Sequence, residues 1–280
     1  MNSLELLKIG SKKLSQQSIH SHQLDAEILL ATVLKKRREE ILVNLDQKIK
    51  DEKIIEFNSL IQRRSLKEPI AYIVKEKEFW SKNFLVNKNT LIPRPETELL
   101  VEKIINIYRN KKISILDIGT GSGCILISLL SELTDSWGVG IDVSKKALII
   151  AKKNSVKHLV NKRIKFYNKS INQFLSQKFD VIVSNPPYIE QQNIKNLQDD
   201  VKKYEPIIAL DGGNDGLDVI KKVIYKAKYI LKINGMLAIE IGNEQYLKVS
   251  EILRKNNFRI KYNIKDYKEN IRCLISTLIK

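Results

Sequence analysis

An Asn-Pro-Pro-Tyr stretch at residues 185–188 combines a polar amide with a stiff backbone. It follows residues 179–183, a short apolar run that is typical of a buried strand. The two prolines have no backbone N–H and a fixed φ, so the strand must end there. Asn185 is therefore expected at the carboxyl end of a strand, where open α/β sheets bind ligands. Its amide, with Tyr188 nearby, could hold a planar group that bears an NH₂, although a Pro-Pro pair alone more often marks an ordinary turn.

A Gly-x-Gly-x-Gly loop is the second candidate binding element. It comprises Gly119, Thr120, Gly121, Ser122 and Gly123. An apolar strand is expected directly before the loop and an apolar helix directly after it. Glycines adopt positive φ and let a ligand approach the backbone, while the N-terminus of the helix offers free N–H groups. The spacing differs from the G-x-G-x-x-G dinucleotide fingerprint, and no G-K-[ST] supplies a phosphate-binding lysine.

Asp142 ends the next expected strand, residues 139–142, at about 20 residues after the glycine loop. A carboxylate at this place can accept hydrogen bonds from both ribose hydroxyls of a nucleoside. The order strand, glycine loop, strand, Asp and then Asn-Pro-Pro-Tyr resembles the class I methyltransferases that bind S-adenosylmethionine. This resemblance implies an α/β, Rossmann-like fold with a mostly parallel seven-stranded sheet.

The hydrophobic periodicity predicts three parts of the chain. Residues 1–70 carry apolar side chains at helical spacing and are expected to form a small helical domain. Residues 71–90 are expected to form a β-hairpin linker, with two strands around a turn at residues 81–83. Residues 91–280 alternate strand and helix, which is the pattern of a parallel sheet, and the resemblance implies that they form the S-adenosylmethionine-dependent catalytic domain.

A proline-stiffened segment, Leu91-Ile92-Pro93-Arg94-Pro95-Glu96-Thr97-Glu98, precedes the first helix of this catalytic domain. Two prolines two residues apart fix an extended backbone. Arg94 and Glu96 could line a pocket, or the segment could be a plain linker with solvated charges. Tyr204, Glu205 and Asp215 lie in a long stretch after residue 188 that could close over a substrate or form a surface loop.

Several longer motifs extend the resemblance beyond the cofactor fold. They are residues 91–98, 115–123 and 183–189, Tyr204-Glu205-Pro206 with Ala209-Leu210, and residues 212–217. Together they resemble the release factor glutamine methyltransferases of the PrmC/HemK type. The match covers about residues 68–280, whereas the helical domain of residues 1–70 resembles the family only in length and helicity. The resemblance implies methylation of the side-chain amide nitrogen (N5) of the glutamine in the Gly-Gly-Gln motif of peptide chain release factors.

The resemblance also implies roles for individual residues. S-adenosyl-L-methionine would be bound by Gly119, Thr120, Gly121, Ser122, Gly123, Asp142, Ser170, Ile171 and Asn185. The substrate amide would be bound by Asn185, Pro186, Pro187 and Tyr188. The side-chain oxygen of Asn185 and the backbone carbonyl of Pro186 are the expected catalytic groups, because two acceptors can grip both N–H bonds of the amide. Ser170 and Ile171 stand near the place where many relatives carry an acid beside the adenine.

The mechanism implied by these groups needs positioning more than base catalysis. An amide nitrogen is a weak nucleophile because it shares its lone pair with the carbonyl, whereas the methyl group of a sulfonium is already activated. Holding the nitrogen, the methyl group and the sulfur in line can lower a barrier by about 7–11 kcal/mol in ideal cases. Acceptors aimed at the developing positive charge add electrostatic stabilisation.

Composition and charge set the remaining expectations. Cys124 and Cys273 are the only two cysteines of the chain and lie far apart, which favours a reducing cytoplasm, and neither they nor the three histidines have metal-ligand spacing. No apolar run approaches a membrane span, so neither a membrane nor a metal is expected. The net charge of +17 comes mostly from scattered lysines and indicates either a compositional bias or an anionic partner.

Two further classes of function remain as alternatives. A DNA or RNA methyltransferase could place adenine N6 or guanine N2 in the same Asn-Pro-Pro-Tyr clamp after base flipping. A binding module could retain the fold without catalysis. No domain for sequence readout accompanies the motifs, so a stable nucleic-acid partner is not expected. The release factor is the expected partner, docked by the helical domain.

Overall fold

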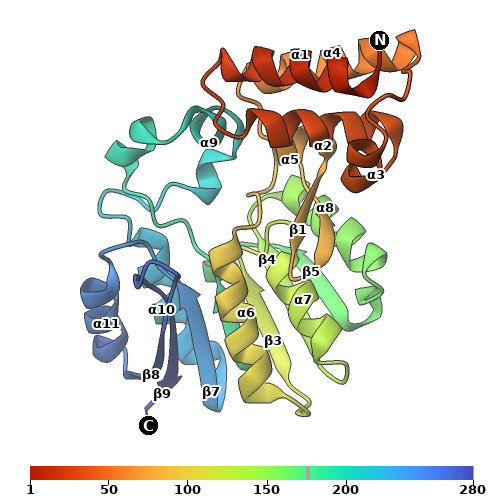
Figure 1. The fold of residues 1–280 in the computed structure, drawn as a ribbon. Coiled ribbons are helices and arrows are strands. Elements are labelled where there is room, and N and C mark those ends of the chain that lie inside the picture. The colour runs from red at the N-terminus through yellow and green to blue at the C-terminus, as the bar shows by residue number, and fades with distance from the viewer. Residues whose placement is uncertain (175–176, 280) are drawn as a thin grey trace. The chain divides into compact units, whose positions relative to one another are not determined.

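The computed structural model describes residues 1–174 and 177–279 and divides the chain into two compact units. The smaller unit comprises Met1–Lys75 together with Gln198–Tyr204, and the larger comprises Glu76–Leu197 together with Glu205–Lys280. The chain therefore enters the smaller unit twice, which can be followed by colour in Figure 1. Each unit has its own hydrophobic core.

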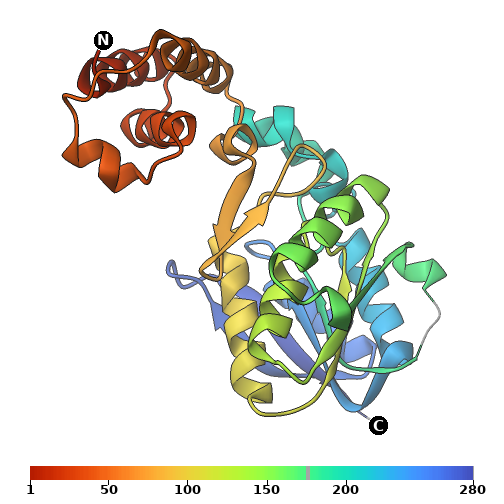
Figure 2. The same ribbon diagram turned by 90° about the vertical axis from the view of Figure 1, so that its right-hand side faces the viewer.

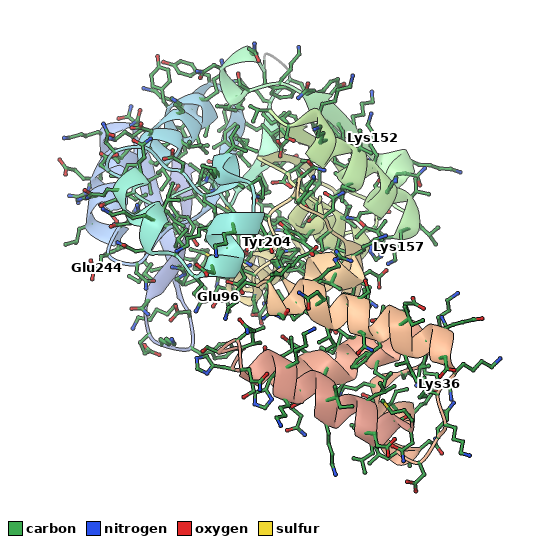
Figure 3. All side chains as sticks on the ribbon, turned by 90° about the horizontal axis from the view of Figure 1, so that it is seen from above. Lys36, Glu96, Lys152, Lys157, Tyr204 and Glu244 are labelled. Carbon is green, nitrogen blue, oxygen red and sulfur yellow. The ribbon has the colours of Figure 1, made fainter. Side chains whose placement is uncertain are left out.

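The smaller unit is helical. Its helices are α1 (Ser3–Ser15), α2 (His22–Leu34), α3 (Arg38–Val43), α4 (Asp51–Ser65), α5 (Ile70–Val74) and α9 (Asp199–Tyr204). Apolar residues at helical spacing turn inward, so that Leu14, Leu30 and Phe57 are fully buried in one cluster. The hydroxyl of Tyr204, labelled in Figure 3, donates to the carbonyl of Leu66 at 2.8 Å and ties α9 to the end of α4.

The larger unit is built on a seven-stranded sheet in the order β5-β4-β3-β6-β7-β9-β8. Its strands are β3 (Ser114–Ile118), β4 (Trp137–Asp142), β5 (Ile164–Asn168), β6 (Phe179–Ser184), β7 (Leu231–Glu240), β8 (Phe258–Lys265) and β9 (Ile271–Leu278). All pairings from β5 to β7 are parallel, and β9 runs antiparallel to both of its neighbours. The sequence-based expectation of a mostly parallel seven-stranded α/β sheet is confirmed.

Helices cover both faces of this sheet (Figures 1 and 2). They are α6 (Pro95–Tyr108), α7 (Cys124–Glu132), α8 (Lys145–Lys157), α10 (Asp218–Ile230) and α11 (Tyr246–Lys255). Successive strand residues point to opposite faces, so Ile115 packs in the cluster of α6 and α7 and Leu116 in the cluster of α10 and α11. Short 3₁₀ turns complete the unit: η1 (Asn161–Arg163), η2 (Ile171–Gln173), η3 (Gln191–Asn196) and η4 (Ile207–Ala209).

A two-stranded antiparallel hairpin opens the larger unit. It pairs β1 (Glu76–Phe79) with β2 (Lys82–Leu85). The hairpin was expected, but the turn predicted at residues 81–83 is wrong, because Trp80 and Ser81 form it with φ values of 52° and 53°. Two residues with positive φ match the twist of the flanking strands, so the short turn prevails and Lys82 joins the ladder.

No helix within the described ranges, 1–174 and 177–279, is both long enough and apolar enough to cross a membrane.

The buried side chain of Asn154 on α8 joins the hairpin to the glycine loop. Its Oδ1 accepts from the N–H of Leu85 at 2.8 Å, and its Nδ2 donates to the carbonyls of Leu85 and Ser122 at 3.0 and 2.8 Å. These bonds give hydrogen-bond partners to the backbone groups of Leu85, at the end of β2, and of Ser122 in the glycine loop. One fully buried amide thus connects three segments that are distant in sequence.

We expect Asn154→Ala to lower the free energy of unfolding by about 2–4 kcal/mol, because each buried group left without a partner costs about 1–3 kcal/mol. Urea denaturation measures this change. The matched control is Lys153→Ala on the exposed side of the same helix, which should stay within about 0.5 kcal/mol of the parent protein. Equal stability of the two variants would contradict the bridging role of Asn154.

Candidate active site

A cavity of about 330 Å³ opens at the carboxyl edge of the sheet in the larger unit. Seven predicted site residues line it: Gly119, Gly121, Asp142, Ser170, Ile171, Asn185 and Pro187. Apolar walls are supplied by Leu91, Ile118, Ile141, Val143, Ala147, Pro206, Ile208, Ala209 and Val219. The cavity therefore pairs a mostly apolar lining with a few polar groups, which is the usual composition of a small-molecule site.

The glycine loop turns sharply between β3 and α7. Gly119, Gly121 and Gly123 have φ values of 74°, 56° and 83°, a region that L-residues with a side chain rarely adopt. The N–H groups of Gly119 and Thr120 both donate to the carbonyl of Ile141, at 2.9 and 3.0 Å. A Cβ built on Gly119 would meet no atom within 4 Å, so the backbone at this position faces open space. The loop can accept a ligand in direct contact with its backbone.

Asp142 braces the same loop. Its Oδ2 accepts from the N–H of Gly121 at 2.9 Å, and its Oδ1 accepts from the N–H of Ser144 at 2.8 Å. Burial raises the pKa of this carboxyl, while the backbone hydrogen bonds oppose the rise. A carboxylate that lines a cavity and already holds the loop fits a diol ligand such as ribose.

Asp117, on β3, is fully buried beneath the glycine loop. Its Oδ2 accepts from the hydroxyl of Thr120 at 2.6 Å, which fixes Thr120 inside the protein rather than in the cavity. Burial raises the pKa of the Asp117 carboxyl to about 7. Thr120, Ser122 and Gly123 were also predicted to contact the cofactor, but all three are buried and none of them lines the cavity.

The Asn-Pro-Pro-Tyr stretch leaves β6 at the far side of the cavity. Asn185 and Pro187 line the cavity, whereas Pro186 is buried. The ring of Tyr188 lies within 5.5 Å of the Arg272 guanidinium, which donates to its hydroxyl at 3.0 Å. Burial raises the pKa of Tyr188 to about 12. Tyr188 thus packs behind the motif in this structure, and its predicted contact with the substrate stays a prediction.

Two motifs that are distant in sequence meet beside the cavity. The carboxylate of Glu205, which is 1% exposed, accepts from the N–H of Ile92 at 3.1 Å and from the guanidinium of Arg94 at 2.5 Å. Arg94 was expected either to line a pocket or to lie in a linker with solvated charges. It is not among the residues that line the cavity, and it pairs with Glu205. Leu91 lies shortly before Arg94 and Ile208 shortly after Glu205, so this ion pair helps to fix both as walls of the cavity.

The sequence analysis did not single out Glu240 and assigned no role to Thr97, although both are linked to Asn185 by hydrogen bonds. Asn185 Nδ2 donates to the hydroxyl oxygen of Thr97 at 3.1 Å, and Thr97 donates to the buried carboxylate of Glu240 at 2.6 Å. Glu240 ends β7, as Asp142 ends β4, so an acid at the end of an apolar strand was the available signal. Thr97 lies inside a quoted motif but had no assigned role. Glu205 lies in the loop between α9 and η4, as expected, and it is buried there.

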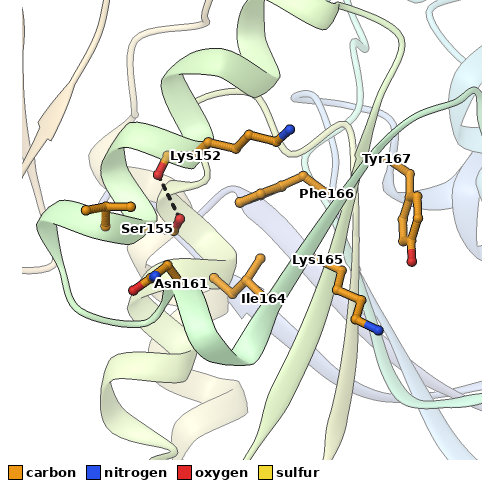
Figure 4. Close-up of a pocket in the computed structure, with 8 residues that line it drawn as sticks. Lys152, Ser155, Asn161, Ile164, Lys165, Phe166 and Tyr167 are labelled. Atoms are coloured by element: carbon orange, nitrogen blue, oxygen red, sulfur yellow. Dashed lines mark hydrogen bonds between the residues drawn. The ribbon is translucent and has the colours of Figure 1, made fainter.

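A second hollow, of about 460 Å³, lies between α8 and β5 and is shown in Figure 4. Its lining includes Lys152, Ser155, Ile164, Lys165 and Phe166. The hydroxyl of Ser155 donates to the carbonyl of Lys152 at 2.8 Å, an ordinary bond within a helix. The hollow shares no residue with the cavity at the carboxyl edge, so the motif residues point to the latter as the active site.

A pH-dependent stability follows from the buried Asp117. The folded protein holds this proton up to about pH 7, whereas the unfolded chain releases it near pH 4. The higher pKa of Asp117 in the folded protein therefore stabilises the fold at low pH, and this contribution is lost as the pH rises through 7. The variant Asp117→Asn keeps an acceptor for Thr120 but cannot titrate. Its free energy of unfolding, relative to that of the parent, should therefore rise by about 1–3 kcal/mol from pH 5 to pH 8. Urea denaturation at both pH values measures it, and a constant difference would contradict the prediction.

Comparisons with known proteins agree with this geometry. Residues 5–74 match the model of the PrmC N-terminal domain, and residues 109–274 match that of a methyltransferase domain. The chain is 44% identical to the release factor glutamine methyltransferase of Buchnera aphidicola subsp. Schizaphis graminum, over 97% of this chain and 98% of that protein. It is 38% identical to the bifunctional methyltransferase of Rickettsia prowazekii over 96% of this chain, which spans only 56% of that protein.

A solved structure supports the fold alone. The catalytic domain of hMettl16 superimposes with a TM-score of 0.59 over 82% of this chain and 83% of that chain, at 16% identity. The match of residues 109–274 to a methyltransferase domain, together with this fold, makes the larger unit a class I methyltransferase domain, for which S-adenosylmethionine is the cofactor. The sequence of residues 1–70 resembled the family only in length and helicity, but residues 5–74 match the PrmC N-terminal domain. From both domain matches and the full-length similarity, the chain belongs to the family of release factor glutamine methyltransferases.

Proposed function

We propose that this chain methylates the side-chain amide nitrogen (N5) of the glutamine in the Gly-Gly-Gln motif of peptide chain release factors. The observation that carries the proposal is the place of Asn185, whose amide lines the same cavity as the glycine loop and Asp142. The name of the Buchnera relative, which this chain matches over nearly its whole length, supports the same substrate class. We further infer a cytoplasmic reaction, because peptide chain release takes place there.

The residues of the cavity fit S-adenosylmethionine. Gly119 offers open backbone to the methionine part, Asp142 offers a carboxylate to the ribose, and Ile141 and Ile171 offer apolar surface to the adenine. Ser170 also lines the cavity. Its hydroxyl donates to Gln173 Oε1 at 3.1 Å and accepts from the backbone N–H of Gln173, which leaves one lone pair as an acceptor. The bound cofactor would supply a methyl group activated by a sulfonium.

Asn185 and Pro186 would supply the two acceptors for the substrate. The side-chain oxygen of Asn185 and the carbonyl of Pro186 would each accept one N–H of the glutamine amide and fix the direction in which its nitrogen faces the methyl group. Such positioning, with acceptors directed at the nitrogen as it becomes positive, replaces a strong base. The proton can leave to water after transfer.

The smaller unit would recognise the substrate. A Gly-Gly-Gln loop is flexible and offers little surface, so ordering it costs conformational entropy that other contacts must offset. The PrmC N-terminal domain has its own buried core and none of the motif residues. We propose that it docks the folded release factor, with no stable nucleic-acid partner in the reaction.

The proposal predicts that an intact release factor gains one methyl group on the glutamine of its Gly-Gly-Gln motif. We expect Asn185→Ala to lower single-turnover methylation by about a hundredfold, the loss seen when a group that stabilises transition-state charge is removed. Its affinity for S-adenosylmethionine should change much less. Mass spectrometry of the digested factor locates the methyl group, and calorimetry measures cofactor binding.

The same assay separates the alternatives. A short Gly-Gly-Gln peptide should be methylated far more slowly than the intact factor if the smaller unit docks the protein. Label from the cofactor on adenine or guanine in cell extract, with none on the factor, would instead support the nucleic-acid reaction. A factor glutamine that gains no methyl group from the parent enzyme would rule out the proposed function.

A second prediction concerns Asp142. Charged hydrogen bonds to a ribose diol contribute roughly 1.5–3 kcal/mol, so Asp142→Ala should weaken S-adenosylmethionine binding by about one to two decades. Calorimetry gives the affinity, and Asp135→Ala, at an exposed position before β4, is the charge-matched control. Because Asp142 also holds Gly121, thermal unfolding must show that the variant is folded. Unchanged affinity in a folded variant would remove Asp142 from the cofactor site.

A further inference from the structure

Three side chains from three different elements form a continuous hydrogen-bonded chain behind the cavity. Asn185 follows β6, Thr97 lies in the first turn of α6, and Glu240 ends β7. Asn185 Nδ2 donates to Thr97 Oγ1 at 3.1 Å, and Thr97 Oγ1 donates to Glu240 Oε2 at 2.6 Å. All three belong to the larger unit. Only Asn185 reaches the cavity, so Thr97 and Glu240 form a layer behind it.

The protons of this chain can be assigned by counting donors. A carboxylate accepts only, and the hydroxyl of Thr97 has a single proton, which the short contact places on the bond to Glu240. The oxygen of Thr97 can then only accept from Asn185. The atom of Asn185 that faces Thr97 is therefore its NH₂, and its Oδ1 is left for a ligand in the cavity.

The surroundings of Glu240 keep its carboxylate as the acceptor of the Thr97 proton. The carboxylate is 0% exposed, so water does not compete for its oxygens. Its Oε1 accepts from the hydroxyl of Tyr188 at 3.4 Å, and the guanidinium of Arg272 lies 3.8 Å away. Burial raises the pKa of Glu240, whereas the Thr97 hydrogen bond and the positive charge of Arg272 oppose the rise. The buried negative charge has a cation and hydroxyl donors around it, as buried charges require.

We propose that Thr97 and Glu240 are positioning residues that set the orientation of the Asn185 amide, so that Oδ1 and not Nδ2 meets the methyl-accepting amide. The inference rests on the proposed function. A substrate amide presents an NH₂, so the reversed orientation of Asn185 would place two donors face to face. Nothing in the side chain of Asn185 itself distinguishes the two orientations, since they differ by a rotation of the terminal amide.

Substitutions at Thr97 test the proposal directly. Thr97→Val keeps the shape of the side chain but removes the hydroxyl, and Thr97→Ser keeps the hydroxyl. We expect Thr97→Val to lower single-turnover methylation of the release factor about tenfold, as the loss of one oriented hydrogen bond allows. Its affinity for S-adenosylmethionine should stay within about twofold of the parent, and Thr97→Ser should restore most of the rate.

A double-mutant cycle distinguishes positioning from a merely structural role. If Thr97 acts through Asn185, then Thr97→Val should have almost no further effect on methylation in the Asn185→Ala background. Equal losses in both backgrounds would overturn the proposal. Glu240→Gln gives a second check, because its NH₂ would donate to Thr97 and turn the Thr97 proton towards Asn185. This variant should also lose rate while it retains cofactor binding.

A readout without substrate separates this inference from the proposed function. The side-chain NH₂ resonances of Asn185 can be assigned in ¹⁵N-labelled protein by their loss in Asn185→Ala. We expect Thr97→Val to shift them and speed their hydrogen exchange, and Thr97→Ser to preserve them. An active parent whose Thr97→Val variant keeps both the rate and the resonances would overturn the inference alone. A parent that shows the coupling but methylates no release factor would support the oriented amide and overturn the proposed function.

Discussion

The parallel pairing of β3 with β6 is the constraint on which the rest of the site depends. Ile118 is the partner of Ser184 in this ladder, so Gly119 and Asn185 leave the sheet side by side. The strand order reverses at this point, since β4 and β5 extend the sheet in one direction and β7 in the other. Such a reversal leaves a crevice at the carboxyl edge, which is where the cavity lies.

Carboxylates hold the walls of this crevice in place without a ligand. Asp142 binds the glycine loop, Glu205 binds the segment before α6, and Glu240 binds Thr97 at the start of α6. Each of these segments is irregular backbone or a helix end, where N–H or hydroxyl groups need partners. Burying an acid without a partner is costly, so each carboxylate is stable only while its segment stays in place. The acids therefore preorganise the site.

The sequence alone determined the parallel sheet, the crevice at its carboxyl edge and the strand-end residues that line this crevice. Alternating apolar strands and helices predict a parallel sheet, because only buried strands carry such continuous apolar runs. Gly119, Asp142 and Asn185 could be placed at one edge because strand ends of a parallel sheet meet there. The turn of the hairpin could not be placed to the residue, since Trp80 and Ser81 are not typical residues for positive φ.

Tertiary structure alone decided which side chains meet across the chain. Asn185 and Thr97 are 88 residues apart, and Arg94 and Glu205 are 111 apart, so no local pattern links them. Their pairing depends on where α6 and the segment after residue 197 pack, which is set by the burial of many apolar side chains at once. The residue types alone show that Asn185, Arg94 and Glu240 carry polar groups, and such groups need hydrogen-bond partners when they are buried. Which partner satisfies each of them, and hence which way the Asn185 amide turns, follows only from the folded core.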